Sequence, residues 1–294
     1  MTTKEFDTMI IGHVSLDEII YNNELSTLYG GAVVYSGYSA IAGGNNVAIF
    51  TKYANDNKKD VEELFNDQKF SLFLQPTKNK TSIRNEYLSE DRERRICTAL
   101  SVADQFTIDE IPDVKSKIYH LAGLIVGDYS DEMIKYLSKK GKVAVDVQGY
   151  LRKNDKGNMF FEDWEEKKKY LPYIHFLKTD AAEAEIMTGE TDRLKAAKIL
   201  YEWGAKEIMI TYNTEVLVYD GTEFYTSPLV PRQLSGRTGR GDTCFSAYIT
   251  ERLNRNIPES IEYAAALVSL KMETPGPFRG TREDVEKYIE QFYR

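Results

Sequence analysis

The seven residues from 236 to 242 combine glycines with basic residues and end in a carboxylate: Gly236-Arg237-Thr238-Gly239-Arg240-Gly241-Asp242. The apolar spacing of residues 243–253 is that of an amphipathic helix, so the glycine-rich run opens a helix with Asp242 in its first turn. Backbone N–H groups there lack partners inside the helix and, with the helix dipole, form an anion site. A carboxylate beside an anion site is electrostatically unfavourable, which suggests that it has a function there. We predict that Asp242 takes a proton from a hydroxyl group while the N–H groups hold a phosphoryl group.

The same run has a simpler interpretation, because glycine-rich turns before helices are common and aspartate is favoured at helix starts for capping alone. Two other phosphate loops are excluded. The chain contains no GxxxxGK[ST] pattern, and the spacing G-x-x-G-x-G lies too late in the chain for a dinucleotide fingerprint, which follows the first strand. The loop by itself leaves a phosphate site and an ordinary capped turn both open.

Residues 238–242 resemble the end of the signature D-T-x-G-A-G-D of the PfkB (ribokinase-like) carbohydrate kinase family. The resemblance extends, in order, over nearly the whole chain. Gly30-Gly31 matches the family's glycine pair, which opens a helix beside the sugar, and Asp17 matches its early aspartate that binds substrate hydroxyls. Residues 176–189 match a strand followed by the N-x-x-E motif, with Asp180 in place of the asparagine.

This resemblance implies an α/β fold of the ribokinase-like type, with a mostly parallel central sheet, helices on both faces and a small β-lid. It also implies ATP and Mg²⁺ as cofactors. The catalytic residues are then Asp242 as base, with Gly239, Arg240 and Gly241 as the anion hole. The cofactor-binding residues are Lys178, Thr211, Asn213, Arg237 and Thr238. The substrate-binding residues are Asp17, Gly30, Gly31 and Tyr35, and the residues that hold Mg²⁺ through water are Asp180 and Glu183.

Two pairs among these residues have alternative interpretations. Asp180 and Glu183 lie three apart on one helix face, which suits a metal, but the same spacing is a capping box that needs no metal. Arg237 and Arg240 have the planar guanidinium that binds phosphate well. They equally suit solvent exposure or pairing with acidic groups.

The chain also departs from the family's pattern. Gly236-Arg237 replaces the leading Asp-Thr, Arg240 replaces an alanine, and Tyr35 stands where an asparagine is frequent. Residues 212–215 replace glycines, and Ala265 replaces an asparagine sometimes found near adenine. These differences leave the nucleotide-base contacts, the monovalent-cation contacts and the identity of the sugar open.

Residues 146–152 read D-V-Q-G-Y-L-R, a pattern similar to a subgroup of the family that includes inositol- and nucleoside-kinase-like members. A tight turn with Arg152 as its anchor is the alternative.

The order of strands and helices favours a parallel sheet that binds ligands at the carboxyl ends of its strands. The predicted strands are 8–12, 47–51, 70–74, 118–122, 143–147, 174–177 and 207–211, with an antiparallel pair at 216–219 and 223–225. The predicted helices are 32–42, 61–66, 131–140, 162–170, 181–188, 192–203, 241–253, 258–272 and 281–292. Lid strands are expected near 13–29 and 81–102, with a charged turn at 91–95.

Composition narrows the class of protein. The 294 residues are 42% hydrophobic, enough for a sizeable core, and we assign residues 1–294 to a single kinase domain. A net charge of −8 argues against nucleic acid as a partner. No apolar run approaches the about 20 residues that span a membrane, and the N-terminus has no signal-peptide character. Cys97 and Cys244 lack metal spacing and are expected to be reduced thiols in a cytoplasmic protein.

Together these observations predict an ATP-dependent kinase that phosphorylates a hydroxyl of a sugar, polyol or nucleoside. Two alternatives stay open: an inactive regulator that binds a sugar or nucleotide, and a kinase that uses ADP or pyrophosphate as donor. Because lid hairpins of the family often pair between subunits, a homodimer through the lid is a further possibility.

Overall fold

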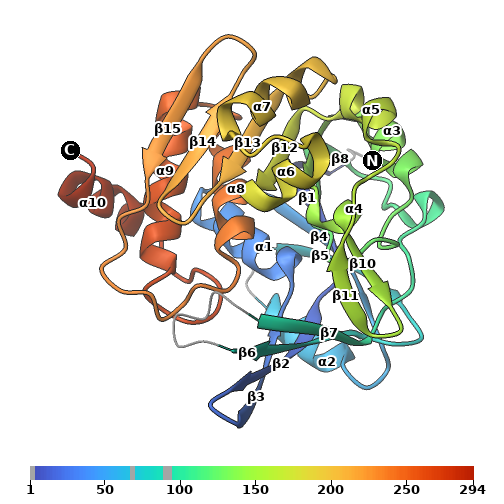
Figure 1. Cartoon of the computed structure of the whole chain (residues 1–294). Coiled ribbons are helices and arrows are strands. Elements are labelled where there is room, and N and C mark those ends of the chain that lie inside the picture. Colours follow the sequence, from blue (N-terminus) through green and yellow to red (C-terminus); the bar gives the residue numbers. More distant parts are fainter. Residues whose placement is uncertain (1–3, 67–69, 89–94) are drawn as a thin grey trace.

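The computed structural model describes residues 4–66, 70–88 and 95–294 and arranges them as two β-sheets with flanking helices (Figure 1). The larger sheet has nine strands in this part of the chain. Their order is β15 (Phe224–Pro228), β14 (Glu215–Tyr219), β13 (Glu207–Thr211), β12 (Phe176–Asp180), β9 (Lys142–Asp146), β8 (Lys115–Leu121), β1 (Glu5–Ile11), β4 (Val47–Tyr53) and β5 (Phe70–Pro76). Neighbouring strands from β13 to β5 are all parallel, and β14 at one edge is antiparallel to both of its neighbours, β13 and β15. The prediction of a mostly parallel sheet is confirmed.

Helices cover both faces of this sheet, because successive side chains of a strand point to opposite sides. In β12, Leu177 packs under α3 (Asp131–Ser138), α6 (Ala181–Thr188) and α7 (Arg193–Glu202). Its neighbour Phe176 packs on the other face, under α8 (Arg240–Glu251), α9 (Ile257–Lys271) and α10 (Arg282–Phe292). On that second face α1 (Ala32–Ala42) and α2 (Lys58–Leu64) cover β1 and β4. No helix in the described ranges is long and apolar enough to cross a membrane.

A smaller sheet lies beside the larger one, at the bottom of Figure 1. Its six strands in the described residues follow the order β10 (Arg152–Asp155), β11 (Asn158–Phe161), β7 (Arg95–Ser101), β6 (Thr81–Tyr87), β2 (Ser15–Tyr21) and β3 (Glu24–Gly30). The ranges predicted to carry lid strands supply β2, β3, β6 and β7. Most of the predicted charged turn at 91–95 lies outside the described residues.

One predicted helix is wrong over most of its length. The structure reduces 162–170 to α5 (Lys167–Tyr170), which is followed by a 3₁₀ turn at Leu171–Tyr173. Trp164 explains the difference, because its ring stacks on Tyr150 at 4.5 Å and its Nε1 donates to Asp131 at 3.2 Å. These tertiary contacts keep residues 162–166 out of the helix, although the spacing of their apolar residues favours one.

Sequence analysis also missed the β10–β11 hairpin and the short helix α4 (Gln148–Leu151) before it. Each hairpin strand has only four residues, all polar in β10 and mostly apolar in β11, and neither strand shows an alternation of apolar and polar side chains. The two strands are joined by a tight turn, in which Lys156 and Gly157 both have positive φ, 51° and 97°.

Two helices that meet the site are held together by serine hydroxyls. Ser39 Oγ on α1 donates to the Thr243 carbonyl on α8 at 2.8 Å, and Ser246 Oγ on α8 donates to the Ser36 carbonyl on α1 at 2.7 Å. These two buried bonds fix the N-terminus of α8 against α1.

Candidate active site

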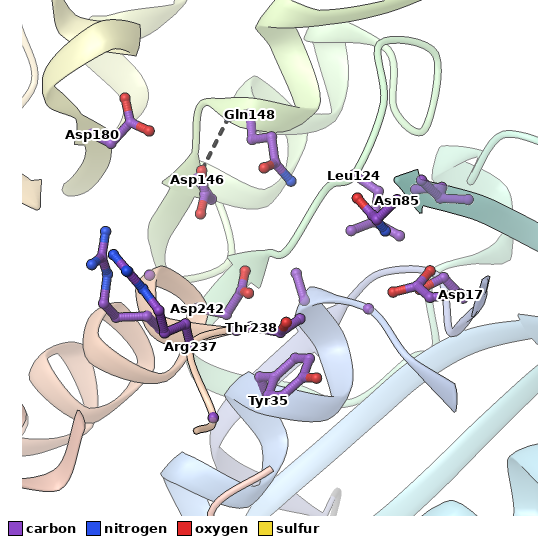
Figure 2. Close-up of a pocket in the computed structure, with 18 of the residues that line it drawn as sticks. Asp17, Tyr35, Asn85, Leu124, Asp146, Gln148, Asp180, Arg237, Thr238 and Asp242 are labelled. Atoms are coloured by element: carbon purple, nitrogen blue, oxygen red, sulfur yellow. Dashed lines mark hydrogen bonds between the residues drawn. The ribbon is translucent and has the colours of Figure 1, made fainter. Parts of the chain in front are cut away.

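A pocket of about 640 Å³ opens where the carboxyl ends of β9, β12 and β13 face the smaller sheet. Figure 2 shows its centre, with Asp242 between an end that carries Asp180 and Arg237 and an end that carries Asp17 and Asn85. The structure brings together all the predicted site residues except Gly30: Asp17, Gly31, Tyr35, Lys178, Asp180, Glu183, Thr211, Asn213, Arg237, Thr238, Gly239, Arg240, Gly241 and Asp242. Gly30 lies just behind the wall, where a Cβ would come within 3.5 Å of Asp17 Oδ2.

The glycine-rich loop ends at Gly239, which is the N-cap of α8 and has a φ of 76°. Among the predicted anion-hole amides, the Arg240 N–H is already engaged, because it donates to the Arg237 carbonyl at 3.2 Å. The N–H groups of Gly239 and Gly241 have no acceptor within the described residues. The anion-binding capacity of the loop therefore rests on these two glycines and on the first turn of α8.

A buried cluster of charges lies under this turn. Lys178 Nζ is 3.0 Å from Asp146 and 3.6 Å from Glu183, and all three residues are buried. Burial by itself lowers the pKa of Lys178, but the surrounding carboxylates outweigh burial and raise its pKa above the ordinary value. A Cβ on Gly241 would lie 3.2 Å from the same Nζ, so the ammonium group touches the backbone of the loop.

The surroundings of Asp242 disfavour the charged form of its carboxyl group. Burial, reinforced by the charge of Asp146, raises the pKa of Asp242 to about 6, although Lys178 and Arg152 act in the opposite direction. A carboxylate with a pKa near neutrality is well matched to accept a proton from a hydroxyl group.

Asp180 and Glu183 form the capping box that their spacing allows. Asp180 Oδ1 accepts from the Glu183 N–H at 2.8 Å, and Glu183 Oε2 accepts from the Asp180 N–H at 2.7 Å. Burial raises the pKa of Glu183. The described residues contain no group of three or more His, Cys, Asp or Glu that could hold a metal directly. The carboxylates of Asp180 and Glu183, with Asp146 nearby, still suit Mg²⁺ held through water, because this ion takes few protein ligands and keeps several waters.

The end of the pocket that carries Arg237 and Arg240 is basic and polar. Figure 2 shows Arg237 on the same side of the pocket as Asp180, and the Arg240 guanidinium donates to Asn213 Oδ1 at 3.0 Å. Thr211 completes this side from the end of β13. Ala265, which replaces a family residue near adenine, is fully buried in α9 and does not line the pocket.

The opposite end, which carries Asp17, contains lining residues that were not predicted as site residues from the sequence: Asn85, Leu124, Gln148 and Arg152. Arg152 is buried, and its Nε donates to the Leu124 carbonyl at 2.7 Å. The pattern at 146–152 was the available signal for Gln148 and Arg152, and Arg152 is indeed an anchor. No local signal marked Asn85 or Leu124, because β6 and the segment after β8 reach the pocket only through the fold.

Tyr35 joins the two ends. Its buried ring lies against Gly239, where any Cβ would clash with it, and its hydroxyl side faces Asp17 and Gly30. Burial raises the pKa of Tyr35, so the phenol stays protonated and can donate a hydrogen bond.

Known proteins with similar sequences and structures belong to one family of kinases. The chain matches the pfkB family carbohydrate kinase over residues 11–283. A cytidine kinase from Thermococcus kodakarensis is 28% identical over 256 residues, which are 83% of this chain and 87% of the relative. A pyrophosphate-dependent kinase in the ribokinase family, solved with a pyrophosphate analog and myo-inositol, superposes with a TM-score of 0.88. It is 32% identical over 95% of this chain and 99% of that one.

A ribokinase of Arabidopsis thaliana, solved with ribose and ATP, has a TM-score of 0.76 at 15% identity and covers 98% of this chain and 99% of its own. At that identity the likeness shows the fold alone. The ribokinase-like fold predicted from the sequence is confirmed.

Gly239→Ala tests the close approach of the loop to Tyr35. The alanine would meet positive φ and the Tyr35 ring together, so the loop must shift. Gly189→Ala is the matched control, because Gly189 has nearly the same φ of 75° and no atom near its Cβ. We expect both variants to lose about 1 kcal/mol or more of stability from positive φ. Only Gly239→Ala should lose activity, by about 10²-fold in kcat/KM. Equal activities in a steady-state assay would contradict this role of Gly239.

Proposed function

We propose a donor, an acceptor and residue roles for this chain, which belongs to the pfkB family of carbohydrate kinases and is a phosphotransferase acting on a hydroxyl group. The proposed donor is inorganic pyrophosphate, and the proposed acceptor is a polyol with several hydroxyl groups. The observation that carries the proposal is the position of Asp242, between an arginine-lined end and an end lined by hydroxyl-binding side chains.

In the proposed reaction Asp242 removes the proton of the acceptor hydroxyl as its oxygen attacks the near phosphorus of the donor. The bond between that phosphorus and the bridging oxygen breaks, and inorganic phosphate leaves with the electron pair. The N–H groups of Gly239 and Gly241 hold the transferring phosphoryl group, with Lys178 beneath them. Asp180 and Glu183, with Asp146 nearby, would hold Mg²⁺ through water, and the ion would neutralise donor charge.

The donor argument starts from the contents of the basic end. Arg237 and Arg240 can bind the oxygens of a second phosphate group, and Thr211, Thr238 and Asn213 add polar contacts. Ala265, at the position of a family residue found near adenine, is buried away from the pocket and therefore offers no contact to a base. The relative with 32% identity is described as pyrophosphate-dependent, which supports the same donor. ATP, the donor implied by the family resemblance, stays a prediction that the same assay tests.

The acceptor argument rests on the opposite end. Asp17, Asn85, Gln148 and the Tyr35 hydroxyl offer several hydrogen-bonding groups around one small volume, as a ring with many hydroxyls requires. Gly31 lets the start of α1 pack against the backbone at His13, because a Cβ there would be 2.5 Å from the His13 carbonyl oxygen. The likeness to a kinase solved with myo-inositol supports a cyclic polyol, while the cytidine kinase relative keeps nucleosides in the test panel.

The test is turnover by the purified protein with Mg²⁺, with pyrophosphate, ATP and ADP as donors and cyclitols, sugars and cytidine as acceptors. We expect phosphorylated polyol only with pyrophosphate. Turnover with ATP alone would overturn the proposed donor. Thermal stabilisation by an acceptor without turnover from any donor would favour the regulator.

Asp242→Asn tests both the role of Asp242 as base and the cost of its buried charge to the stability of the fold. We expect kcat to fall about 10²–10⁴-fold in the variant. In the wild-type enzyme kcat/KM should decline as pH falls through about 6, because protonated Asp242 cannot accept a proton. Since its pKa is raised on folding, ionised Asp242 destabilises the fold above that pH. The variant should therefore unfold a few degrees higher at pH 8, and this gain should vanish near pH 4.

The control for the stability measurement is Asp104→Asn. The pKa of Asp104 is lowered, chiefly by the hydrogen bonds from the Lys78 N–H and the Thr77 hydroxyl, so its charge stabilises the fold above its ordinary pKa. This variant should keep full activity and lose stability at pH 8. A higher melting temperature in both variants would show that the gain at position 242 is not specific to the site.

Arg237→Ala and Arg240→Ala test the donor end. Loss of one charged hydrogen-bonding partner should raise the KM for pyrophosphate about 10-fold or more, with a small effect on the KM of the acceptor. Arg255→Ala, on an exposed arginine beside α9, serves as control and should leave both constants unchanged. Unchanged donor KM in both site variants would reject the phosphate role of these arginines.

The smaller sheet also supports a homodimer. Strand register aligns Leu25, Ile20, Glu86 and Ile96 in one row across β3, β2, β6 and β7, and Leu25 and Ile96 are 61% and 51% exposed. We expect Leu25→Lys with Ile96→Lys to halve the mass measured by light scattering at micromolar concentration. Leu194→Lys, on exposed α7, is the control. A monomeric wild-type protein would contradict this arrangement.

A further inference from the structure

Lys271 is a fully buried lysine at the last residue of α9, with a relative exposure of 1%. Its Nζ donates to the Gly236 carbonyl at 2.6 Å and to the Thr238 carbonyl. The backbone supports the same junction, because the Gly236 N–H donates to the Met272 carbonyl at 2.8 Å. The segment just before the anion-binding turn is thus bound to the end of α9.

The surroundings of Lys271 differ from those of the other buried lysines. Lys178 is paired with Asp146, and Lys52 is 2.8 Å from Glu110. The ion pairs found among the described residues do not include Lys271, whose neighbours are carbonyl oxygens and the Tyr35 ring at 5.1 Å. Burial lowers the pKa of Lys271 to about 8, and the Asp242 carboxylate opposes that shift. A buried ammonium group costs free energy, so it needs a compensating role.

The geometry of the peptide group suggests that role. In a trans peptide the carbonyl oxygen and the following N–H point in opposite directions. An ammonium group that draws the Thr238 carbonyl toward α9 therefore turns the Gly239 N–H away from α9. The Gly236 carbonyl fixes the Arg237 N–H in the same way. The Gly239 N–H is one of the two predicted anion-hole amides that lack an acceptor in the described structure.

We propose that Lys271 is a positioning residue whose ammonium group orients the 236–239 peptides so that the Gly239 N–H faces the donor phosphoryl group. Lys271 touches neither donor nor acceptor in this arrangement. Its charge replaces a diffusible cation as the partner of the two carbonyls. The inference rests on the proposed phosphoryl transfer, because it assigns Lys271 to the loop that holds the transferring group.

Lys271→Met tests the proposal, since methionine keeps the length of the side chain and removes the ammonium group. We expect kcat to fall about 10²-fold while the KM of the acceptor changes less than about twofold. The carbonyl oxygens left facing the vacated space should bind a small cation, so ammonium, methylammonium or potassium chloride should restore much of kcat. Sodium or tetramethylammonium chloride at equal ionic strength is the salt control.

Lys52→Met is the matched control, because Lys52 is also buried and also donates to a carbonyl, but to that of Gln105 and not to a carbonyl of the 236–242 loop. It should lose thermal stability without a specific loss of kcat and without rescue by cations. A Lys271→Met enzyme with wild-type kcat would overturn the proposal. So would a loss of kcat that no small cation restores and that only parallels a loss of stability.

Amide hydrogen exchange separates this inference from the proposed function. In Lys271→Met, with or without inorganic pyrophosphate, residues 236–241 should exchange faster than in the wild-type protein, and ammonium should slow the exchange again. Lys52→Met should show no change in that segment. Unchanged exchange at 236–241 would overturn the role of Lys271 even in an active enzyme. A wild-type protein without turnover on any donor would overturn the proposed function and leave this measurement decisive for Lys271.

Discussion

The buried ammonium group of Lys178 is the interaction on which the site depends. Asp146, Glu183 and Asp242 converge on a small volume at the ends of β9, β12 and the start of α8, and without a cation three carboxylates would repel one another there. Lys178 permits that convergence because it neutralises charge where water has been excluded. Its contact with Gly241 favours glycine at that point of the loop, since a Cβ there would lie 3.2 Å from the ammonium group and push it aside by a few tenths of an ångström.

A second constraint fixes the two ends of the pocket relative to each other. The serine bonds between α1 and α8 and the contact of the Tyr35 ring with Gly239 join the helix that follows Gly31 to the helix that follows the glycine-rich loop. Both helices start at a glycine with positive φ, Gly31 and Gly239, so their first turns point into one pocket. Transfer between two bound groups requires such a fixed separation.

The sequence predicted much of this because the relevant signals are local. The loop with Gly239 and Asp242, and the strands with continuous apolar runs, are each readable from a few neighbouring residues. Asn85, Leu124 and Lys271 were not found, since they reach the site through strand pairing or helix packing over long distances in the chain. For Asp180 and Glu183 the local pattern was correct but compatible with two roles, and the structure shows that the capping box forms.

Burial shifts the pKa values of Asp242 and Lys271 in opposite directions, because it disfavours the charged form of each group. Burial raises the pKa of the carboxyl group to about 6 and lowers the pKa of the ammonium group to about 8. The Asp242 carboxylate opposes the shift of Lys271, so it partly offsets the cost of burying that ammonium group. Burial thus disfavours the charged form of both groups, the carboxylate that we propose as the base and the ammonium group that we propose as the anchor of the loop. Removal of the Asp242 charge would leave the buried ammonium group less compensated, which ties the proposed base to the proposed anchor.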